Sequence, residues 1–191
     1  MSLDLSNEDC QFQEGPVYDG DGGMWFSLIK KPFSADCSPL GCNFSDEEWN
    51  DSSVEVDSVP PPFDREEVER LELVHLIFTM TANGNLHLAP INWHPQRVLD
   101  IGCGTGTWCI EMADAYPSAE VVGVELSPSQ PMLVPPNLIF HIDDFDDEWN
   151  YTCSFDYIHA RLLAGRIRDW ARLVRQCFEY VFLTSDSSRF C

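Results

Sequence analysis

A glycine-rich turn directly after a short apolar segment constrains the fold of this chain more than any other feature. The segment Val98-Leu99-Asp100-Ile101 runs into Gly102-Cys103-Gly104-Thr105-Gly106-Thr107. A short apolar run that ends in glycines suits a buried strand of a parallel sheet. Glycines also let the backbone turn sharply and approach a ligand closely. The segment therefore predicts a strand followed by a ligand-binding turn.

The spacing of these glycines argues against two phosphate-binding loops. A dinucleotide-binding loop has the pattern G-x-G-x-x-G, which would place its third glycine at position 107, where this chain has threonine. A P-loop has the pattern G-x-x-x-x-G-K, which would place its lysine six residues after Gly102. Trp108 occupies that position, and no lysine follows it. Both interpretations are weak, and the observed pattern is G-x-G-x-G.

Strand-like and helix-like segments alternate after this turn. A chain that alternates strands with helices forms right-handed crossovers and a parallel, doubly wound α/β sheet. We therefore predict a Rossmann-like fold with about four recognisable parallel strands and no internal repeat. The expected strands are 98–101, 120–126, 138–142 and 155–159, and the expected helices are about 107–116 and 166–178.

The chain divides into three parts by composition. Residues 1–63 contain 13 acidic and two basic residues, three prolines in a row at 60–62, and no sustained periodicity. These features predict a largely disordered acidic arm, with local order around Trp25 and Trp49. Asp64 and Glu67 are typical of a helix start, and the helical pattern ends at Asn83-Gly84. We expect an α/β domain over 64–180 and an atypical tail over 181–191.

The sequence from Arg97 to Arg161 resembles a known group. The segments RVLDIGCGTGTW, VVGVELSPSQPMLVPPN and FDYIHAR occur in this order. They resemble the fungal LaeA-like methyltransferases of secondary metabolism, a group of class I S-adenosylmethionine-dependent methyltransferases. The stretch 65–88 resembles the helix that packs beside the cofactor in that group. The resemblance covers about 64–180 and implies that S-adenosylmethionine is the cofactor.

The resemblance also implies which residues bind the cofactor. A carboxylate at the end of the second strand, Glu125, would accept the ribose hydroxyls, as in Rossmann folds. An acid after the third strand would face the adenine amine, with Asp144 favoured over Asp143 and with Ile142 or Phe145 against the ring. The expected cofactor-binding set is Asp100, Gly102, Cys103, Gly104, Gly106, Glu125, Leu126, Asp143 and Asp144.

Structural roles compete with several of these assignments. Asp100 could cap the turn, Glu125 could be a solvated strand end, and the 143–144 acids belong to an acidic run. His159 is a weak candidate for a general base, because a histidine that ends a buried strand is more often structural. The arginines between 161 and 175 form a basic stretch, which we interpret as a solvated helix face rather than a nucleic-acid site. The cysteine and histidine spacing predicts no metal site.

The C-terminal part departs from the pattern of the group. Its members continue with a Lys-Pro-Gly-Gly turn and three further strands, for which the 11 residues after Tyr180 leave no room. We therefore expect an incomplete, apparently truncated sheet in which the fourth strand has an open edge. The apolar face around Trp170 would then lack part of its cover, and Val181-Phe182-Leu183-Thr184 could form only a makeshift strand. This expectation puts catalysis in doubt more than cofactor binding.

Charge and composition limit the remaining functions. A formal net charge of −21 argues against binding of nucleic acid or an anionic membrane by the whole surface. The first residues lack a signal peptide and no apolar run is long enough to span a bilayer, so we expect a reduced, cytoplasmic or nuclear protein. Three functions remain open: a methyltransferase that acts on a small molecule, a LaeA-like regulator that works through a protein partner, and an inactive fragment.

Overall fold

A computed structural model describes residues 10–14, 25–30, 60–91 and 94–181. Its centre is a six-stranded sheet with the order β1-β2-β6-β3-β4-β5. Three helices accompany the sheet in these ranges. The elements are β1 (Cys10–Glu14), β2 (Trp25–Lys30), α1 (Arg65–Thr81), β3 (Arg97–Ile101), α2 (Thr107–Ala115), β4 (Glu120–Glu125), β5 (Leu138–Ile142), β6 (Tyr157–Arg161) and α3 (Trp170–Val181).

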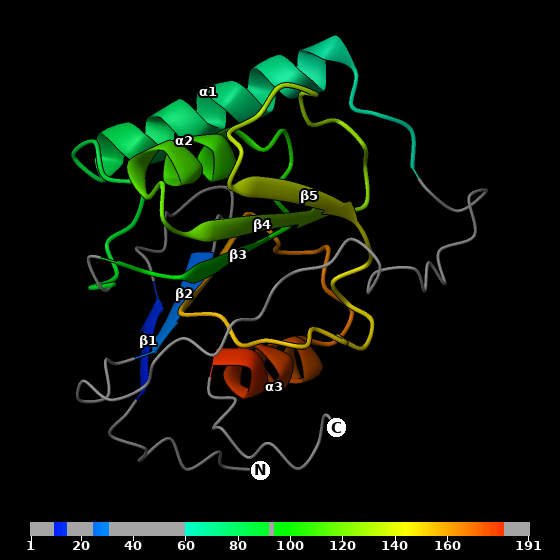
Figure 1. Cartoon of the computed structure of the whole chain (residues 1–191). Coiled ribbons are helices and arrows are strands. Elements are labelled where there is room, and N and C mark those ends of the chain that lie inside the picture. Colours follow the sequence, from blue (N-terminus) through cyan, green and yellow to red (C-terminus); the bar gives the residue numbers. More distant parts are fainter. Residues whose placement is uncertain (1–9, 15–24, 31–59, 92–93, 182–191) are drawn as a thin grey trace.

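Four neighbouring strands, β6, β3, β4 and β5, run parallel to one another. Helices α1 and α2 lie on one side of this sheet and α3 lies on the other (Figure 1). The predicted doubly wound α/β fold with four parallel strands is therefore confirmed. β3, β4 and β5 fall within one residue of the predicted bounds, whereas β6 begins two residues later than expected. Asp156, just before β6, accepts hydrogen bonds from the backbone N–H groups of Gln96 and Arg97.

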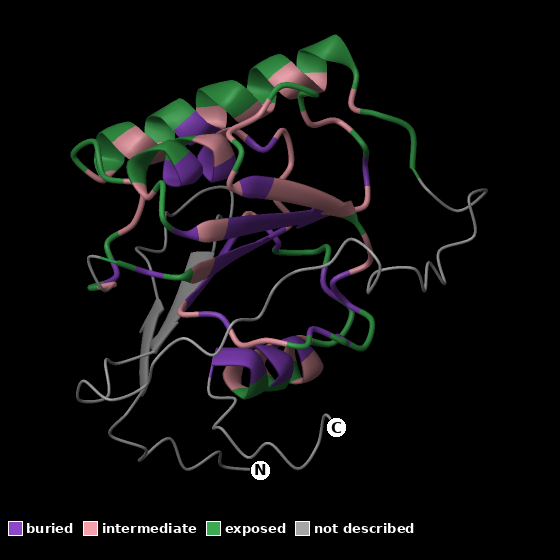
Figure 2. Cartoon of the chain, in the orientation of Figure 1, coloured by how far each residue is buried: buried purple, intermediate pink, exposed green. Residues whose placement is uncertain are grey.

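Alternation along β3 places two cores on opposite faces of the sheet. Leu99 and Ile101 belong to the core under α3, while Val98 packs with Trp108 and Met112 of α2. Successive side chains of a strand point to opposite faces, so a strand buried on both sides is apolar almost throughout. Figure 2 shows β3 and β4 as the most completely buried elements, with the outer surface of α1 exposed. Asp100 is the exception in β3, and it lies on the α2 face.

The edge of β6 is paired, which corrects the expectation of an open strand. β2 runs antiparallel to β6, with Trp25 opposite Arg161 and Ile29 opposite Tyr157. β1 in turn pairs with β2. Both strands come from the segment 1–63 that we predicted to be largely disordered. β2 lies where we expected local order around Trp25, whereas β1 differs from the prediction. The rest of that segment up to residue 59 lies outside the described residues.

The helix before the first parallel strand begins as predicted. The Asp64 carboxylate accepts a hydrogen bond from the Glu67 backbone N–H at 2.8 Å, which satisfies one of the free donors of the first turn. The helix ends before Asn83 and Gly84, both of which have positive φ. His75 is the one residue of α1 that is buried. It is therefore the part of α1 that most directly faces the interior.

The last helix starts four residues later than predicted. Asp169 accepts from the Arg172 backbone N–H at 3.0 Å and so begins the helix at Trp170, whereas Arg168 is held in the preceding loop by Asp146. Leu173 is buried in the core, and Trp170 and Phe178 pack against it. The expectation of an uncovered apolar face is therefore wrong, because this face lies on the sheet. The proposed strand at 181–184 is contradicted at Val181, which ends α3, and its other residues lie outside the described ones.

Two further properties concern the described residues. None of their helices combines the length and the apolarity that crossing a membrane requires. Cys103, Cys109 and Cys177 are free thiols.

Candidate functional site

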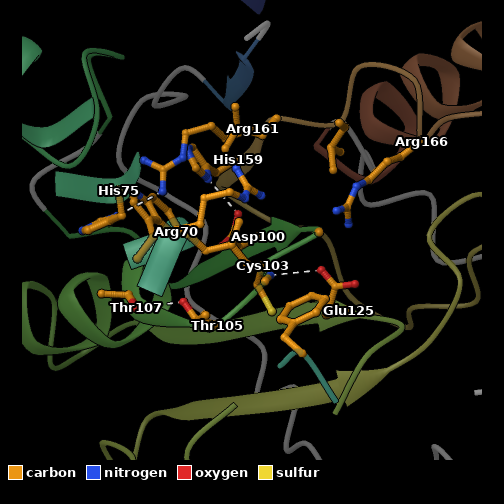
Figure 3. Close-up of a pocket in the computed structure, with 17 residues that line it drawn as sticks. Arg70, His75, Asp100, Cys103, Thr105, Thr107, Glu125, His159, Arg161 and Arg166 are labelled. Atoms are coloured by element: carbon orange, nitrogen blue, oxygen red, sulfur yellow. Dashed lines mark hydrogen bonds and ion pairs between the residues drawn. The ribbon is translucent and has the colours of Figure 1, made fainter. Parts of the chain in front are cut away.

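A cavity of about 270 Å³ opens where β3, β4 and β6 end, beneath α1. Ligands of open α/β sheets bind at the carboxyl ends of the strands, so this is the expected place for a site. Figure 3 shows the lining side chains converging from the sheet, the glycine turn and α1. The lining includes Arg70, Leu71, His75, Asp100, Gly102, Cys103, Gly104, Thr105, Thr107, Trp108, Glu125, His159, Arg161 and Arg166.

The glycine turn leaves open space at its centre. Gly102, Gly104 and Gly106 all have positive φ, a conformation that L side chains rarely adopt. A side chain at 102 would overlap Leu163 and one at 106 would overlap Phe140, so those two glycines serve close packing. At Gly104 the nearest atom to an added Cβ is Leu71 Cδ1 at 3.7 Å. Gly104 is thus the glycine that keeps the cavity open toward a ligand.

Glu125 joins the end of β4 to the glycine turn. Its side chain is buried at 5 % exposure. Oε2 accepts a hydrogen bond from the Gly104 backbone N–H at 3.0 Å, and Oε1 accepts from the Leu126 N–H at 3.0 Å. Gln130 holds the other side of the same glycine by donating to its carbonyl oxygen at 2.6 Å. The carboxylate is therefore fixed at the cavity wall, and each oxygen retains a further lone-pair direction.

Asp100 and His159 form a buried pair on adjacent parallel strands. The two residues stand opposite each other in the register, and Asp100 Oδ1 lies 2.7 Å from His159 Nδ1. Asp100 Oδ2 accepts from the Cys109 thiol at 3.1 Å. The His159 ring stacks on Trp108, with 3.9 Å between the ring centroids and 6° between the planes. Burial lowers the pKa of His159, against the opposing effect of Asp100.

Helix α1 contributes residues that the sequence did not single out. His75 Nε2 lies 3.0 Å from Glu111 Oε2, and His75 Nδ1 lies 3.0 Å from Arg161 Nη2. Arg70 makes two hydrogen bonds of 2.7 Å to Glu67. The available signal was the resemblance of 65–88 to a helix beside the cofactor, together with a histidine within an apolar stripe. That signal indicates the helix but not which of its residues face the cavity.

The structure brings together six of the ten predicted site residues. The remaining four do not line the cavity. Gly106 forms the start of α2, and Leu126 contributes only the N–H that Glu125 accepts. The six that line the cavity are Asp100, Gly102, Cys103, Gly104, Glu125 and His159.

Asp143 and Asp144 lie beside the cavity rather than in its wall. Asp143 donates its backbone N–H to the Glu125 carbonyl oxygen at 3.3 Å, and burial raises the pKa of its half-buried carboxyl. Asp144 Oδ2 forms an ion pair with Arg168 at 2.7 Å. The preference for Asp144 as the adenine contact stays a prediction, and these partners give Asp144 a structural role. Of the two ring-stacking candidates, Ile142 is 47 % exposed and Phe145 is buried beside Gly102.

Within the described ranges, no three His, Cys, Asp or Glu side chains are grouped so that they could hold a metal ion. Asp100 and His159 are bonded to each other, Glu125 to backbone N–H groups, and His75 to Glu111 and Arg161. The cavity walls therefore offer hydrogen-bonding groups at fixed positions around a space whose floor is the glycine turn.

The sequence profile of the methyltransferase domain family matches residues 73–183, which contain α2, the four parallel strands and most of this cavity. The chain belongs to this family. The match includes the glycine turn, Glu125 and the Asp100–His159 pair. The family assignment therefore rests on the same segment that forms the site.

Curated relatives confirm the resemblance to the LaeA-like group. Methyltransferase pytC of Aspergillus terreus is 43% identical over 125 residues, which are 65% of this chain and 39% of pytC. Secondary metabolism regulator LAE1 of Cochliobolus heterostrophus is 38% identical over 63% of this chain and 41% of that protein. Protein-methionine methyltransferase laeA of Emericella nidulans is 40% identical over 63% of this chain and 33% of laeA. The matched part thus spans about two fifths of these relatives' length or less.

A solved structure also aligns with the chain. It is the plantazolicin methyltransferase BpumL in complex with a triazolic desmethylPZN analog and SAH. The alignment covers 59% of this chain and 41% of that chain, with a TM-score of 0.38 and 18% sequence identity.

Proposed function

We propose that this chain binds S-adenosylmethionine in the cavity above the glycine turn and transfers its methyl group to a small-molecule acceptor of fungal secondary metabolism. The observation that carries the proposal is the Glu125 carboxylate, held by the Gly104 N–H at the edge of the open space. The family and the LaeA-like relatives support the same chemistry.

The residues of the cavity fit this cofactor. Space above Gly104 admits a ligand against the backbone, where any side chain would protrude into the cavity. Glu125 has free lone-pair directions for the two ribose hydroxyls, each of which would form a charge-assisted hydrogen bond. Bound S-adenosylmethionine supplies an electrophilic methyl group on a sulfonium centre. The role of this chain's residues is to bind and orient that ligand and to exclude water from it.

His159 has the geometry of a base, although its part in transfer stays a prediction. Because a carboxylate only accepts hydrogen bonds, Asp100 fixes the tautomer of His159 in which Nδ1 carries the proton. Burial lowers the pKa of this histidine, so the ring is neutral at pH 7 and its Nε2 lone pair is available to accept a proton. Asp100 acts here as a positioning residue.

Calorimetric titration of the purified chain tests the binding step. We expect S-adenosylmethionine and S-adenosylhomocysteine to bind and NAD to give no heat, because the glycine spacing is not that of a dinucleotide-binding loop. Replacement Gly104→Asp should abolish binding by filling the open space and adding a charge. Unchanged affinity in that variant would contradict the assignment of the cavity.

A second candidate function is regulation of secondary-metabolism genes through a protein partner, with little methyl transfer. The identity to regulators of the LaeA group favours it. Methylated products and transcript levels, compared between the native strain and a strain carrying Gly104→Asp, distinguish the two candidate functions. An enzyme variant should lose a methylated product while transcript levels persist, whereas a regulator variant should lose transcripts of whole gene clusters.

We further propose a cytoplasmic or nuclear location and no direct contact with nucleic acid or membranes. The formal net charge of −21 supports the second part of this proposal, since phosphate backbones and anionic lipids repel such a surface. A fluorescent fusion expressed in the fungus tests the location. A secreted fusion would contradict it.

A further inference from the structure

A guanidinium group lines the cavity without a carboxylate beside it. Arg161 ends β6 and is half-buried. Its Nη2 donates to His75 Nδ1 at 3.0 Å, and its Cζ lies 4.9 Å from the centroid of the Phe78 ring. None of the ion pairs among the described residues includes Arg161. A buried charge is costly unless a partner compensates for it.

The contact with His75 does not neutralise this charge. A guanidinium group has only donors, so His75 Nδ1 must accept and carries no proton. The other nitrogen, Nε2, then carries the proton and donates to Glu111 at 3.0 Å. His75 is therefore a neutral link that orients Arg161, and the nearest charge in this chain of contacts is Glu111 on the far side of the ring. Burial lowers the pKa of Arg161, against the opposing effect of the nearby Asp100 and Glu111.

The cavity lining contains both basic and acidic side chains. Three of only 11 basic residues in the chain line it: Arg70, Arg161 and Arg166. Arg70 is already paired with Glu67. The two acids of the lining, Asp100 and Glu125, are engaged by His159 and by backbone N–H groups. In Figure 3 Arg161 lies beside His75 and Arg166 lies nearer Glu125, so the two remaining guanidinium groups approach the cavity from different positions.

We propose that Arg161, supported by Arg166, binds a carboxylate group of the ligand. A guanidinium presents parallel N–H donors that match the two oxygens of a carboxylate, and Arg161 forms no ion pair with a carboxylate among the described residues. The inference rests on the proposed function, because the rest of the ligand is either the cofactor or the methyl acceptor. The carboxylate therefore belongs to the amino-acid end of S-adenosylmethionine or to an acidic acceptor molecule.

The first arm of the test compares two cofactors that differ in this group alone. S-adenosylmethionine and decarboxylated S-adenosylmethionine are titrated into the wild-type chain, Arg161→Gln and Arg161→Lys, with folding checked by circular dichroism. Arg175→Gln is the matched control, because Arg175 is an exposed residue of α3 that does not line the cavity. If the carboxylate is that of the cofactor, the wild type prefers S-adenosylmethionine at least tenfold. Arg161→Gln then removes that preference, Arg161→Lys keeps part of it, and the control keeps all of it.

The second arm tests an acidic acceptor. Benzoate and its neutral analogue benzamide are titrated, by NMR, into the chain saturated with S-adenosylhomocysteine. Binding of benzoate alone, lost in Arg161→Gln, with an unchanged cofactor preference, assigns the carboxylate to the acceptor. If Arg161→Gln folds and alters neither the cofactor preference nor benzoate binding, the proposal is wrong.

Failure of the proposed function has a different result. In that case neither cofactor binds to the wild-type chain. The benzoate and benzamide titrations of the free protein then still decide whether Arg161 binds a carboxylate. Loss of benzoate binding in Arg161→Gln supports the proposal. Benzoate binding that is unchanged in Arg161→Gln, or absent in the wild-type chain, overturns it.

Discussion

At the scale of single residues, Glu125 has two tasks that use the same carboxylate. It holds the glycine turn through the Gly104 N–H, and it faces the cavity in which a ribose would lie. The first task keeps the turn in its open conformation, and the second would give the ligand a fixed orientation. Variants at these two positions should therefore separate the shape of the turn from ligand contact.

Gly104→Ala tests the open space, with Gly84→Ala as its matched control. Both glycines have positive φ, and neither has an atom closer than 3.7 Å to an added Cβ. The backbone strain of an alanine should therefore be similar, about 1 kcal/mol at each site. We expect similar losses in thermal stability, but only Gly104→Ala should weaken binding of S-adenosylhomocysteine, by at least tenfold in calorimetry. Equal affinities in the two variants would show that no ligand approaches Gly104.

Glu125→Ala tests the ribose contact. The expected loss of affinity for S-adenosylhomocysteine is at least tenfold, because a charge-assisted hydrogen bond contributes about 1.5–3 kcal/mol. Glu125→Gln should lose less, since it keeps one acceptor oxygen. Glu179→Ala, an exposed residue of α3, is the control. An intact fold by circular dichroism with unchanged affinity in Glu125→Ala would place the ribose contact elsewhere.

The sequence predicted the residues of the glycine turn better than their partners. Asp100 and Glu125 follow from their positions at the ends of apolar strands. The pairing of Asp100 with His159 depends on the register of two strands that are 59 residues apart, which a local pattern does not contain. The place of Arg161 likewise depends on the packing of α1 above the sheet. Such long-range contacts required the structure.

At the scale of elements, the parallel strands were predictable and the antiparallel ones were not. β3, β4 and β5 are short, apolar and bounded by turns, so their pattern indicates buried strands. β1 and β2 lie in an acidic segment without sustained alternation, and their strand structure arises through pairing, of β2 with β6 and of β1 with β2. Edge strands depend less on their own sequence pattern than on the partner they cover.

Deletion of residues 1–31 should destabilise the sheet. It removes β2 and exposes the backbone donors and acceptors of β6, a strand edge that invites association. We expect a lower unfolding temperature and aggregates in size-exclusion chromatography with light scattering. A deletion of residues 1–9, which leaves both strands, is the control. If the longer deletion remains a monomer of unchanged stability, β2 does not protect β6 as described.

At the scale of the whole molecule, buried ionisable groups predict how stability depends on pH. Burial lowers the pKa of His87, His141 and His159 below their ordinary value of 6.5, so the unfolded chain binds more protons than the folded chain below that pH. Burial raises the pKa of Cys103, Cys109 and Cys177 above 9.0, so unfolding releases protons at alkaline pH. Stability should therefore be greatest between about pH 6.5 and 9.

Urea unfolding at pH 5.5, 7.5 and 9.5 measures this dependence. The free energy of unfolding should fall by about 1 kcal/mol or more from pH 7.5 to 5.5, since one pKa unit corresponds to about 1.4 kcal/mol. The raised pKa of Asp143 acts in the opposite direction but has its effect mainly at lower pH. Equal stability at pH 5.5 and 7.5 would contradict the burial of these histidines as neutral groups.

The central claim concerns the whole molecule, because sheet, glycine turn and α1 together enclose one ligand site. A crystal structure of the chain grown with S-adenosylhomocysteine tests it most directly. We predict that the ligand lies above Gly104 in the described cavity, with its ribose hydroxyls within hydrogen-bonding distance of Glu125. A ligand bound elsewhere, or an empty cavity in crystals grown at saturating concentration, would contradict the account.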